Sequence, residues 1–406
     1  MKKILILGGS VLQVPAIIKS KELGLHTIVI DQDSNAIGKS ICDEFFAIST
    51  LDKEKTLKLA KLKKIDAILT IASDLPLKTV AYVGEKLKLN TLNQNVSEIV
   101  TNKYLMREKL SEKGIPCPIY FVTSNLKEYT EIVKMIELPF IVKPCDSSGS
   151  RGVTKVDLLS GAEKAFHHAM NHSKVSSIII EEFLEGPEVS VESLTMDNDT
   201  DILAITDKVT TGAPYFTEMG HSIPTMLSKE IQEDIKSITK NAIEALNINN
   251  SPSHTEIIIT KEGPKIVEVG ARMGGDNITS HLVPMATGYD MMKHVIRLSL
   301  GEKYELEPSI NNSAAIRYLK LNTNTFNGFK NLDDLISLHK PSVFKITHSL
   351  GSTINEIRSS NDRLGYVIYQ ADSVEKAIKK CELLITALNE KLILEKRDMN
   401  EDMDCI

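Results

Sequence analysis

Two apolar strands joined by a short glycine turn stand out in the middle of the chain. Residues 254–269 read HTEIIITKEGPKIVEV, and this pattern predicts a β-hairpin with Gly263 in its turn. If the turn is centred on residue 262, Glu256 and Glu268 lie six residues away on either side and fall opposite one another. Opposed carboxylates on one sheet face repel each other, and a divalent cation between them removes that repulsion. The hairpin therefore predicts a magnesium-type site, with two solvated acids as the alternative.

An arginine and two glycines follow this hairpin directly. Arg272 comes four residues after Glu268, and Gly274 and Gly275 come next. Beside a metal and a phosphate, an arginine neutralises the charge on a transferring phosphoryl group. The downstream residues therefore favour a phosphoryl-transfer site.

Two upstream segments have the composition of a nucleotide site. Lys143 lies at the end of an apolar run, and a loop rich in glycine and serine, residues 146–152, leads to a second strand. Backbone N–H groups of such a loop can approach phosphates closely, and the lysine adds a point charge. The apolar run 178–180 is followed by acids up to Glu188, a segment suited to an adenine edge and ribose hydroxyls. A flexible hairpin loop and a solvated acidic turn are the alternatives.

The first 92 residues alternate between short apolar strands and helices. The expected strands are 3–7, 27–30 and 67–70, and the expected helices are 13–23, 53–63 and 76–88. This alternation predicts a parallel sheet built from βαβ units. Farther along we expect helices at 101–113, 228–246 and 373–389, many strands between 188 and 270, and strands at 314–319 and 366–369.

The turn after the first strand resembles half of a dinucleotide-binding fingerprint. Gly8 and Gly9 precede the first helix, and Asp31 ends the next strand. Gln13 occupies the place of the third glycine that the fingerprint requires. A generic strand-to-helix turn is therefore favoured over NAD binding.

Composition excludes several classes of protein. The chain has 406 residues, which suggests two or three domains, and 42% of them are hydrophobic and 25% charged, as in ordinary globular proteins. The net charge of −6 and the absence of Trp argue against nucleic-acid binding. No apolar run approaches the length of a membrane span. The five cysteines form no CxxC pair and indicate a reducing, cytoplasmic location; they are Cys42, Cys117, Cys145, Cys381 and Cys405.

The motifs occur in the order and approximate spacing of the ATP-grasp superfamily, which the chain resembles over nearly its whole length. Within it, the sequence is most similar to the L-amino-acid ligases (dipeptide synthetases), which are carboxylate–amine ligases, and more distantly to biotin carboxylase. The segments 363–368 and 372–377 resemble the closing β-rich subdomain of that family.

This resemblance implies an α/β protein with the ATP-grasp fold, an N-terminal doubly wound parallel-sheet domain and a C-terminal β-rich subdomain. The implied divisions are an N-terminal α/β domain (1–92), a linker helix (93–115), a lid subdomain (116–185), a large subdomain with the metal site (186–310) and a closing subdomain (311–406).

The resemblance also assigns roles to single residues. Lys103 and Lys143 match the phosphate lysines, residues 147–152 the mobile phosphate loop, 181–184 the adenine hinge, and Glu188 the ribose acid. The implied ATP-binding residues are Lys103, Lys143, Ser147, Ser148, Gly149, Gly152, Glu181, Glu182, Phe183, Leu184 and Glu188. The implied metal ligands are Glu256 and Glu268, the catalytic cations are Lys143 and Arg272, and the substrate residues are Glu218, His221, Arg272, Gly274 and Gly275.

The implied activity is an ATP-dependent ligase that uses Mg²⁺ or Mn²⁺, forms an acyl-phosphate and releases ADP and phosphate. Its expected substrates are a small carboxylate and an amine, with amino acids favoured, and a homodimer is expected by analogy. Bicarbonate, formate or another small carboxylate is the alternative; an NAD-binding oxidoreductase and a non-catalytic nucleotide-binding module are remote ones. Gly270 stands where the family frequently has Asn, which puts the metal geometry in question, and His254 is expected to be a packed neighbour of the site.

Overall fold

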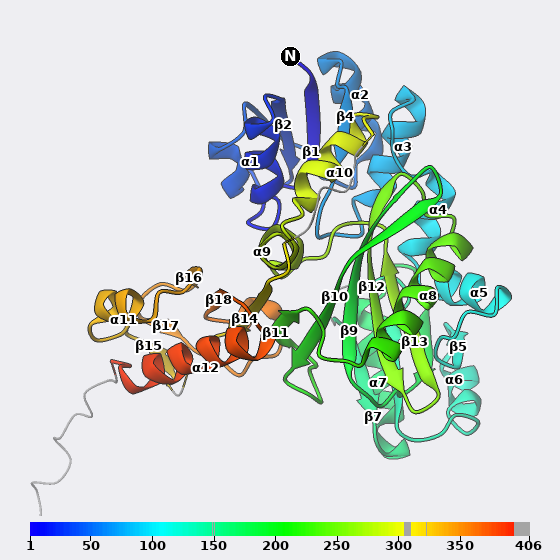
Figure 1. Cartoon of the computed structure of the whole chain (residues 1–406). Coiled ribbons are helices and arrows are strands. Elements are labelled where there is room, and N and C mark those ends of the chain that lie inside the picture. Colours follow the sequence, from blue (N-terminus) through cyan, green and yellow to red (C-terminus); the bar gives the residue numbers. More distant parts are fainter. Residues whose placement is uncertain (148, 150, 304–309, 322, 394–406) are drawn as a thin grey trace, which may run out of the picture.

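Three large layers of strand and helix follow one another along the chain in this computed structural model (Figure 1). The structure describes residues 1–147, 149, 151–303, 310–321 and 323–393. Ser148 of the phosphate loop and Cys405 lie outside the described residues. The fold is of the mixed α/β class, with one parallel sheet and one large antiparallel sheet.

The N-terminal layer is a four-stranded parallel sheet in the order β3-β2-β1-β4. Its strands are β1 (Lys3–Leu7), β2 (His26–Asp31), β3 (Glu44–Ala47) and β4 (Ala67–Leu69), and its helices are α1 (Val14–Glu22), α2 (Lys53–Lys63) and α3 (Leu77–Leu87). The expected strands and helices of this region are confirmed. Strand β3 is additional, and its short, half-buried sequence EFFA carries little periodic signal.

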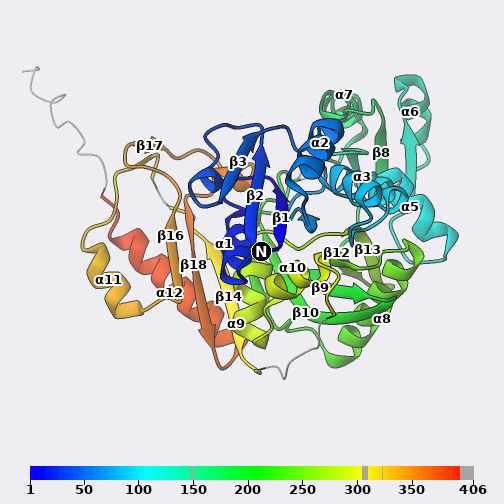
Figure 2. The ribbon, with the colours of Figure 1, turned by 90° about the horizontal axis from the view of Figure 1, so that it is seen from above.

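Side chains of the central strand alternate between two cores. Ile4 and Ile6 pack with α1 on one face of the parallel sheet, and Leu5 and Leu7 pack with α2 and α3 on the other. Helix α10 (Met291–Ser299) comes from far along the chain and joins the first of these cores; Figure 1 and Figure 2 both place it beside this sheet. The N-terminal layer therefore shares its core with a later segment.

Two helices link this layer to the lid. They are α4 (Gln94–Val100) and α5 (Lys103–Glu112). The helix expected over 101–113 is confirmed as α5, and α4 is additional. The Asn102 side chain accepts hydrogen bonds from the backbone N–H groups of Tyr104 and Leu105 and so starts α5.

The lid is a four-stranded antiparallel sheet in the order β5-β8-β6-β7. Its strands are β5 (Tyr120–Thr123), β6 (Phe140–Pro144), β7 (Thr154–Val156) and β8 (Ile178–Glu182), covered by α6 (Leu126–Ile132) and α7 (Ala162–His172). The sequence pattern predicted the strands around the loop but neither of these two helices.

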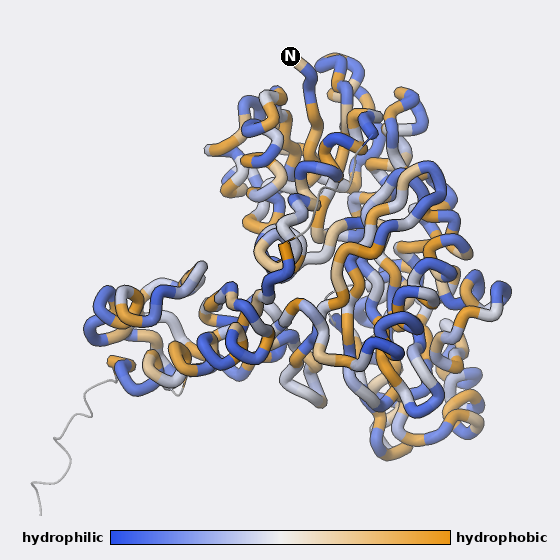
Figure 3. The backbone as a smooth tube through the Cα atoms, viewed as in Figure 1, coloured by the Kyte–Doolittle hydropathy of each residue, from blue (hydrophilic) through white to orange (hydrophobic). Residues whose placement is uncertain are grey.

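The large sheet has eight strands in the order β13-β12-β9-β10-β11-β14-β18-β16. Their bounds are β9 (Glu188–Met196), β10 (Asp199–Thr210), β11 (Glu218–Ile223), β12 (Ser251–Thr260), β13 (Gly263–Gly270), β14 (Ser313–Tyr318), β16 (Val343–Ile346) and β18 (Gly365–Ala371). Helix α8 (Lys229–Ala245) packs on it. Hydrophobic stretches follow the strands of the parallel and the large sheets (Figure 3).

The C-terminal strands continue this same sheet, because β14 pairs with β11 and β18 pairs with β14. The expected strands at 314–319 and 366–369 and the expected helix at 373–389 are confirmed. The remaining elements are α9 (Val283–Thr287), β15 (Thr325–Phe326), β17 (Ser352–Thr353), α11 (Leu332–His339), α12 (Val374–Glu390) and the short turns η1 (Ile37–Ser40), η2 (Leu159–Gly161), η3 (Ile278–Leu282) and η4 (Ser360–Asp362).

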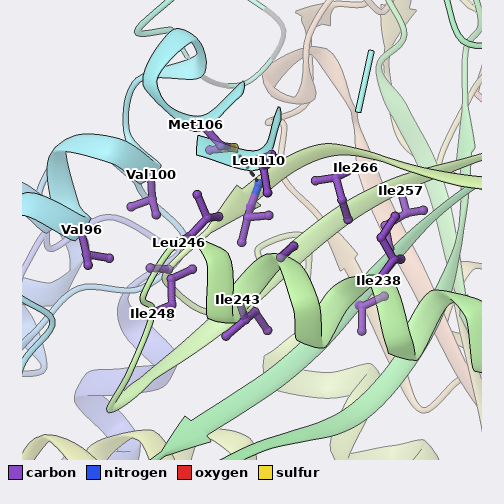
Figure 4. Close-up of a cluster of buried hydrophobic side chains, with 14 of the residues drawn as sticks. Val96, Val100, Met106, Leu110, Ile238, Ile243, Leu246, Ile248, Ile257 and Ile266 are labelled. Atoms are coloured by element: carbon purple, nitrogen blue, oxygen red, sulfur yellow. Dashed lines mark hydrogen bonds between the residues drawn. The ribbon is translucent and has the colours of Figure 1, made fainter. Parts of the chain in front are cut away.

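One buried cluster joins the linker helices to the β12–β13 hairpin. Figure 4 shows Val96 and Val100 of α4, Met106 and Leu110 of α5, and Ile257 and Ile266 of the hairpin in one core with residues of α8. The linker is therefore packed directly against the strands that carry Glu256 and Glu268.

Candidate active site

Glu256 and Glu268 lie opposite one another on β12 and β13, as the sequence predicts. Near the turn the register pairs Thr260 with Gly263 and Ile257 with Ile266, so the expected turn centre at residue 262 is wrong by half a residue. That register alone would place Glu256 opposite Val267. It shifts between Glu256 and Ile257, which leaves Val267 as the extra residue of a β-bulge. The bulge is what brings the two carboxylates into register.

Two lysines reach this carboxylate pair from other elements. Lys103 of α5 lies 3.0 Å from Glu268 and donates a hydrogen bond of 2.8 Å to the carbonyl of Ser147 in the phosphate loop. Lys208 of β10 lies 3.6 Å from Glu256 and 2.6 Å from Glu188. Lys103 belongs to a segment recognisable in the sequence, whereas Lys208 stands in an ordinary strand without a recognisable motif and was not predicted.

The side chains of Glu256 and Lys208 each stabilise the ionised form of the other. Burial lowers the pKa of Lys208, but the neighbouring carboxylates outweigh burial and raise this pKa well above its usual value. Burial raises the pKa of Glu256, but Lys208 and His254 outweigh it and hold this pKa well below its usual range. Glu256 therefore remains a carboxylate, as a metal ligand must.

A second set of charges lies under the lid. Lys143 of β6 lies 2.6 Å from one oxygen of Glu181, and Nε of Arg107 lies 2.9 Å from the other. All three side chains are buried. Burial raises the pKa of Glu181, and the two cations outweigh it and lower this pKa overall. The carboxylate of Glu181, expected at the adenine hinge, thus faces Lys143 and Arg107, which leaves only its backbone for reading a base.

The phosphate loop is anchored at its base. Asp146 accepts a hydrogen bond of 3.1 Å from the backbone N–H of Lys174. Gly152 has φ of +79°, and a Cβ there would lie 2.7 Å from His172, so only glycine fits this close approach. Gly149 also has a positive φ, and nothing lies near the position of its absent Cβ. The loop is therefore held at its ends and open at Gly149.

The expected adenine hinge lies between the lid and β13. Glu182 accepts a hydrogen bond of 2.8 Å from Lys265, which lies on β13. The ammonium of Lys155 lies 4.4 Å from the ring centre of Phe183, and Leu184 is buried. Neither lysine was singled out from the sequence.

Arg272 is held by an acid of the N-terminal layer. Its Nε lies 2.8 Å from Oδ1 of Asp74, and its Nη2 lies 3.3 Å from Oδ2. A small pocket at this place brings together the N-terminal layer, the linker, the phosphate loop and β13; its lining includes Asp74, Thr101, Lys103, Asp146, Ser147 and Glu268. Asp74 follows a strand of the parallel sheet, and acids at the carboxyl ends of such strands often face a site. Asp74 was not predicted from the sequence, although its position after a strand of the parallel sheet could have indicated it.

The presence of Gly270 has a steric explanation. A Cβ at this position would lie 3.1 Å from the guanidinium carbon of Arg272 and 3.2 Å from Oδ1 of Asp74. Any side chain here, including the Asn that the ATP-grasp family frequently has at this position, would push on the Arg272–Asp74 pair. Glycine keeps that pair in place.

His254 is a packed neighbour of the site, as expected. Its Nδ1 lies 2.5 Å from Oε1 of Glu192, and its Nε2 lies 3.6 Å from Glu256. Burial lowers the pKa of His254, but Glu192 outweighs burial and raises the pKa to about 9. Gly274 donates from its backbone to Glu192, and a Cβ on Gly274 would lie 2.7 Å from His254. Glu192, which the sequence analysis missed, thus holds both residues.

The expected substrate residues border a further charged cluster. Glu218 lies 3.5 Å from Lys208, and the buried His221 lies 3.6 Å from Asp276. Arg363 binds both oxygens of Asp276, at 2.7 and 2.8 Å, and lies over the ring of Tyr318 at 3.6 Å. Gly275 precedes Asp276 and approaches Ala72 of the N-terminal layer. From the sequence, the segment that contains Arg363 was noted only because it resembles the closing β-rich subdomain of the family. No role was predicted for Asp276.

The donor set suits a hard divalent cation. Glu256 and Glu268 supply carboxylate oxygens, which Mg²⁺ prefers. Among the described residues no group of three or more His, Cys, Asp or Glu side chains is arranged to hold a metal. The chain thus offers two carboxylates at this place, which fits a cation that completes its shell with phosphate oxygens and water. No helix in the described part of the chain has the length and apolar character to span a membrane.

Comparison with known proteins identifies one domain of this chain and several relatives. Residues 136–280 match the ATP-grasp domain family. The chain is 28% identical over 261 residues to the alanine–anticapsin ligase of Bacillus subtilis, a match that covers 59% of this chain and 54% of that protein. It is 22% identical over 404 residues to the formate-dependent phosphoribosylglycinamide formyltransferase of Actinobacillus pleuropneumoniae, which covers 94% of both chains.

The fold matches a solved structure over its whole length. The L-amino acid ligase from Bacillus licheniformis superposes with a TM-score of 0.82 at 22% identity, covering 98% of this chain and 99% of that chain. The matched domain and the overall fold are those of the ATP-grasp ligases to which this chain is similar. Residues 136–280 of this chain form an ATP-grasp domain.

Proposed function

We propose that the protein is an ATP-dependent carboxylate–amine ligase that forms an amide bond and releases ADP and phosphate. The observation that carries this proposal is the opposed pair Glu256 and Glu268 with Lys103, Lys208 and Arg272 close by. Ionised carboxylates surrounded by cations suit a metal–triphosphate site, where negative charge must be both bound and neutralised. ATP is the proposed nucleotide, and Mg²⁺, or Mn²⁺ in its place, is the proposed metal.

The proposed ATP site lies between the lid and the large sheet. Lys103 and Lys143 would bind the phosphates together with the loop at Ser147, Gly149 and Gly152. Backbone groups of 182–184 would read the adenine, and Glu188 would hold the ribose. A divalent cation held by Glu256 and Glu268 would neutralise the phosphate oxygens.

The reaction has two steps. The substrate carboxylate attacks the terminal phosphorus of ATP, so that a C–O–P linkage forms and the bond to ADP breaks. The amine then attacks the acyl carbon, a C–N bond forms, the C–O bond to phosphate breaks, and the amine loses a proton. Lys143 and Arg272 would hold the charge on the transferring phosphoryl group and on the acyl-phosphate. The phosphate loop would exclude water, which would otherwise hydrolyse the acyl-phosphate.

Amino acids are the proposed substrates because charges of both signs border the phosphate site. Glu218 offers a carboxylate for a substrate ammonium, and Arg272 offers a guanidinium for a carboxylate. His221 is 2% exposed, and neither ring nitrogen has a hydrogen-bond partner among the described residues. A buried ring with unused polar atoms beside Asp276 suits contact with a bound polar ligand. The similarity to an alanine–anticapsin ligase supports the same choice.

A phosphate-release screen tests the proposal. Purified protein is incubated with ATP, Mg²⁺ and pairs of amino acids, and phosphate, ADP and AMP are quantified. We expect phosphate and ADP only when a carboxylate and an amine are both present. AMP and pyrophosphate as products would contradict an acyl-phosphate mechanism. The melting temperature with and without MgADP is measured alongside. If no amino-acid pair gives phosphate release but MgADP raises the melting temperature, amino acids are rejected as substrates and the proposed nucleotide site is supported.

The second candidate is a ligase for formate, bicarbonate or another small carboxylate. The match to a formate-dependent formyltransferase along 94% of both chains favours it. The same assay distinguishes the two, with formate and bicarbonate offered in place of the amino-acid carboxylate. Phosphate release with formate and without any amino acid would decide for this second candidate. The homodimer stays a prediction by analogy, which size-exclusion chromatography with light scattering tests.

A further inference from the structure

Helix α5 and the segment after it lie along the free edge of the hairpin that carries Glu268. Strand β13 is the outermost strand of the large sheet, so no strand among the described residues pairs with its outer backbone groups. Ile266 N–H donates to the carbonyl of Pro116 at 2.9 Å. Val269 N–H points at the sulfur of Met106 at 3.3 Å, and Arg107 Nη2 donates to the carbonyl of Val267. Helix α5 and the segment after it thus provide partners for three outer backbone groups of β13.

The contact of Arg107 falls on the bulge itself. Val267 is the extra residue that lets Glu268 pair with Glu256 instead of lying one position away. A bulge leaves its extra residue out of the hydrogen-bond ladder, and the carbonyl of such a residue needs another donor. Arg107 supplies that donor. A one-residue slip would turn the side chain of Glu268 to the other face of the sheet.

The same guanidinium also reaches the lid. Nε of Arg107 lies 2.9 Å from Glu181, whose other oxygen holds Lys143 at 2.6 Å. Arg107 has no exposed surface, and it follows Lys103 by one helical turn on α5. Lys103 in turn contacts Glu268 at 3.0 Å. Lys103 and Arg107 of α5 therefore each contact both the hairpin and the lid.

We propose that Arg107 is a positioning residue of the metal–phosphate site. It holds the Val267 bulge that keeps Glu268 opposite Glu256, and through Glu181 it fixes Lys143 at the place of the phosphates. Because both contacts start from one residue of helix α5, Arg107 sets the distance between the carboxylates that would bind the metal and Lys143, which would bind the phosphates. This role rests on the proposed function, since it requires Glu256 and Glu268 to bind a metal and Lys143 to bind phosphate.

The test compares Arg107→Met and Arg107→Lys with Glu181→Gln. Arg107→Met removes both contacts; we expect the Mg²⁺ concentration for half-maximal phosphate release to rise about 10- to 100-fold, the usual cost of losing a residue that orients a metal ligand. The KM for ATP should rise with it. Arg107→Lys should restore part of the Mg²⁺ dependence, since one ammonium can still reach a single carbonyl. Glu181→Gln keeps the Val267 contact and should raise the KM for ATP with little change in Mg²⁺ dependence.

Lys109→Met is the matched control, since it removes a cation from the same helix at a position that pairs with the exposed Glu112. It should leave both dependences unchanged. A readout independent of turnover is the rise in melting temperature caused by ADP with and without Mg²⁺. In Arg107→Met the additional rise due to Mg²⁺ should be lost, while the smaller response to ADP alone persists.

The outcomes separate the two proposals. If Arg107→Met and Arg107→Lys lower the melting temperature but keep the wild-type Mg²⁺ dependence, Arg107 has only a structural role and the inference is rejected. If the wild-type protein shows no response to MgADP at all, the nucleotide site itself is rejected. A response to MgADP in the wild-type protein that is equal in Arg107→Met rejects only the role of Arg107.

Discussion

Acidic residues near strand ends occur both in the N-terminal parallel sheet and in the β12–β13 hairpin, and the two regions use them differently. In the parallel sheet, Asp31 accepts hydrogen bonds from the backbone N–H groups of Gly9 at 2.8 Å and Asp33 at 3.0 Å. In the hairpin, Glu268 and Glu256 contact the side-chain cations Lys103 and Lys208. The first acid is bound by its own layer, and the other two by distant elements.

The difference separates structural acids from acids that can bind a ligand. A backbone N–H cannot move away from Asp31, so this carboxylate is committed to closing the turn after β1. Gln13 completes that turn, because its side chain lies against Gly8 and donates to the carbonyl of Ile71. Lysine side chains, in contrast, can exchange one partner for another. The hairpin acids are therefore suited to a metal and phosphates, and the acid of the parallel sheet is not suited to a ribose.

The strongest test of this contrast is Glu268→Ala. Loss of one of two carboxylates should lower the rate of phosphate release about 100-fold or more, with the circular-dichroism spectrum unchanged. Glu262→Ala in the exposed turn of the same hairpin, where the Glu262 carboxylate pairs with Lys265, is the control and should keep full activity. Full activity in Glu268→Ala would remove the metal assignment.

The counterpart in the parallel sheet is Asp31→Ala. Two backbone donors lose their charged acceptor, so the free energy of unfolding in urea should fall by about 2 kcal/mol. KM for ATP should stay at its wild-type value, because Asp31 faces its own turn. NAD should leave the melting temperature of the wild-type protein unchanged; a clear rise would instead support dinucleotide binding at this turn.

The smallest expected effect is a pH dependence in the same layer. Backbone N–H of Thr27 lowers the pKa of Asp43 to about 2, with further lowering by the Thr27 hydroxyl and Lys21. Because this pKa is lower in the folded state than the ordinary value of about 4, the carboxylate stabilises the fold above pH 4 and ceases to do so as the pH falls toward 2.

Asp43→Asn should therefore lower the melting temperature by a few degrees at pH 6, and its difference from the wild type should shrink steadily below pH 4. Scanning calorimetry at several pH values measures this. A difference that stays constant down to pH 2.5 would mean that the charge of Asp43 contributes nothing.

The sequence predicted the elements with strong local signals and missed the weak ones. The β12–β13 hairpin has long apolar runs and a glycine turn, and helix α8 has a clear apolar face, so both were expected. Helices α4 and α6 have seven residues each, too few for a periodic pattern to be distinguished from chance. Helix α7 follows a loop whose glycines and serines dominate the local pattern.

The site followed the same division. Residues within a recognisable motif, such as Lys143 and Glu256, were singled out from the sequence. Arg107, Glu192, Lys208 and Asp74 were not, because each lies on an element far in sequence from the partner that gives it a role. Arg107 and Val267, for example, are separated by 160 positions. No local pattern encodes such a contact.

The sequence alone determined the alternating elements of the N-terminal layer, the hairpin and the order of the motifs, because these depend on neighbours along the chain. It also determined that Glu256 and Glu268 share a strand pair. It further predicted that the two carboxylates lie opposite one another, but only the tertiary structure showed how this is achieved. A bulge at Val267 sets the register, and Arg107, from another layer, donates to the carbonyl of Val267. Hydrogen-bond partners of a sheet edge are selected by packing in space, and packing depends on the whole chain at once.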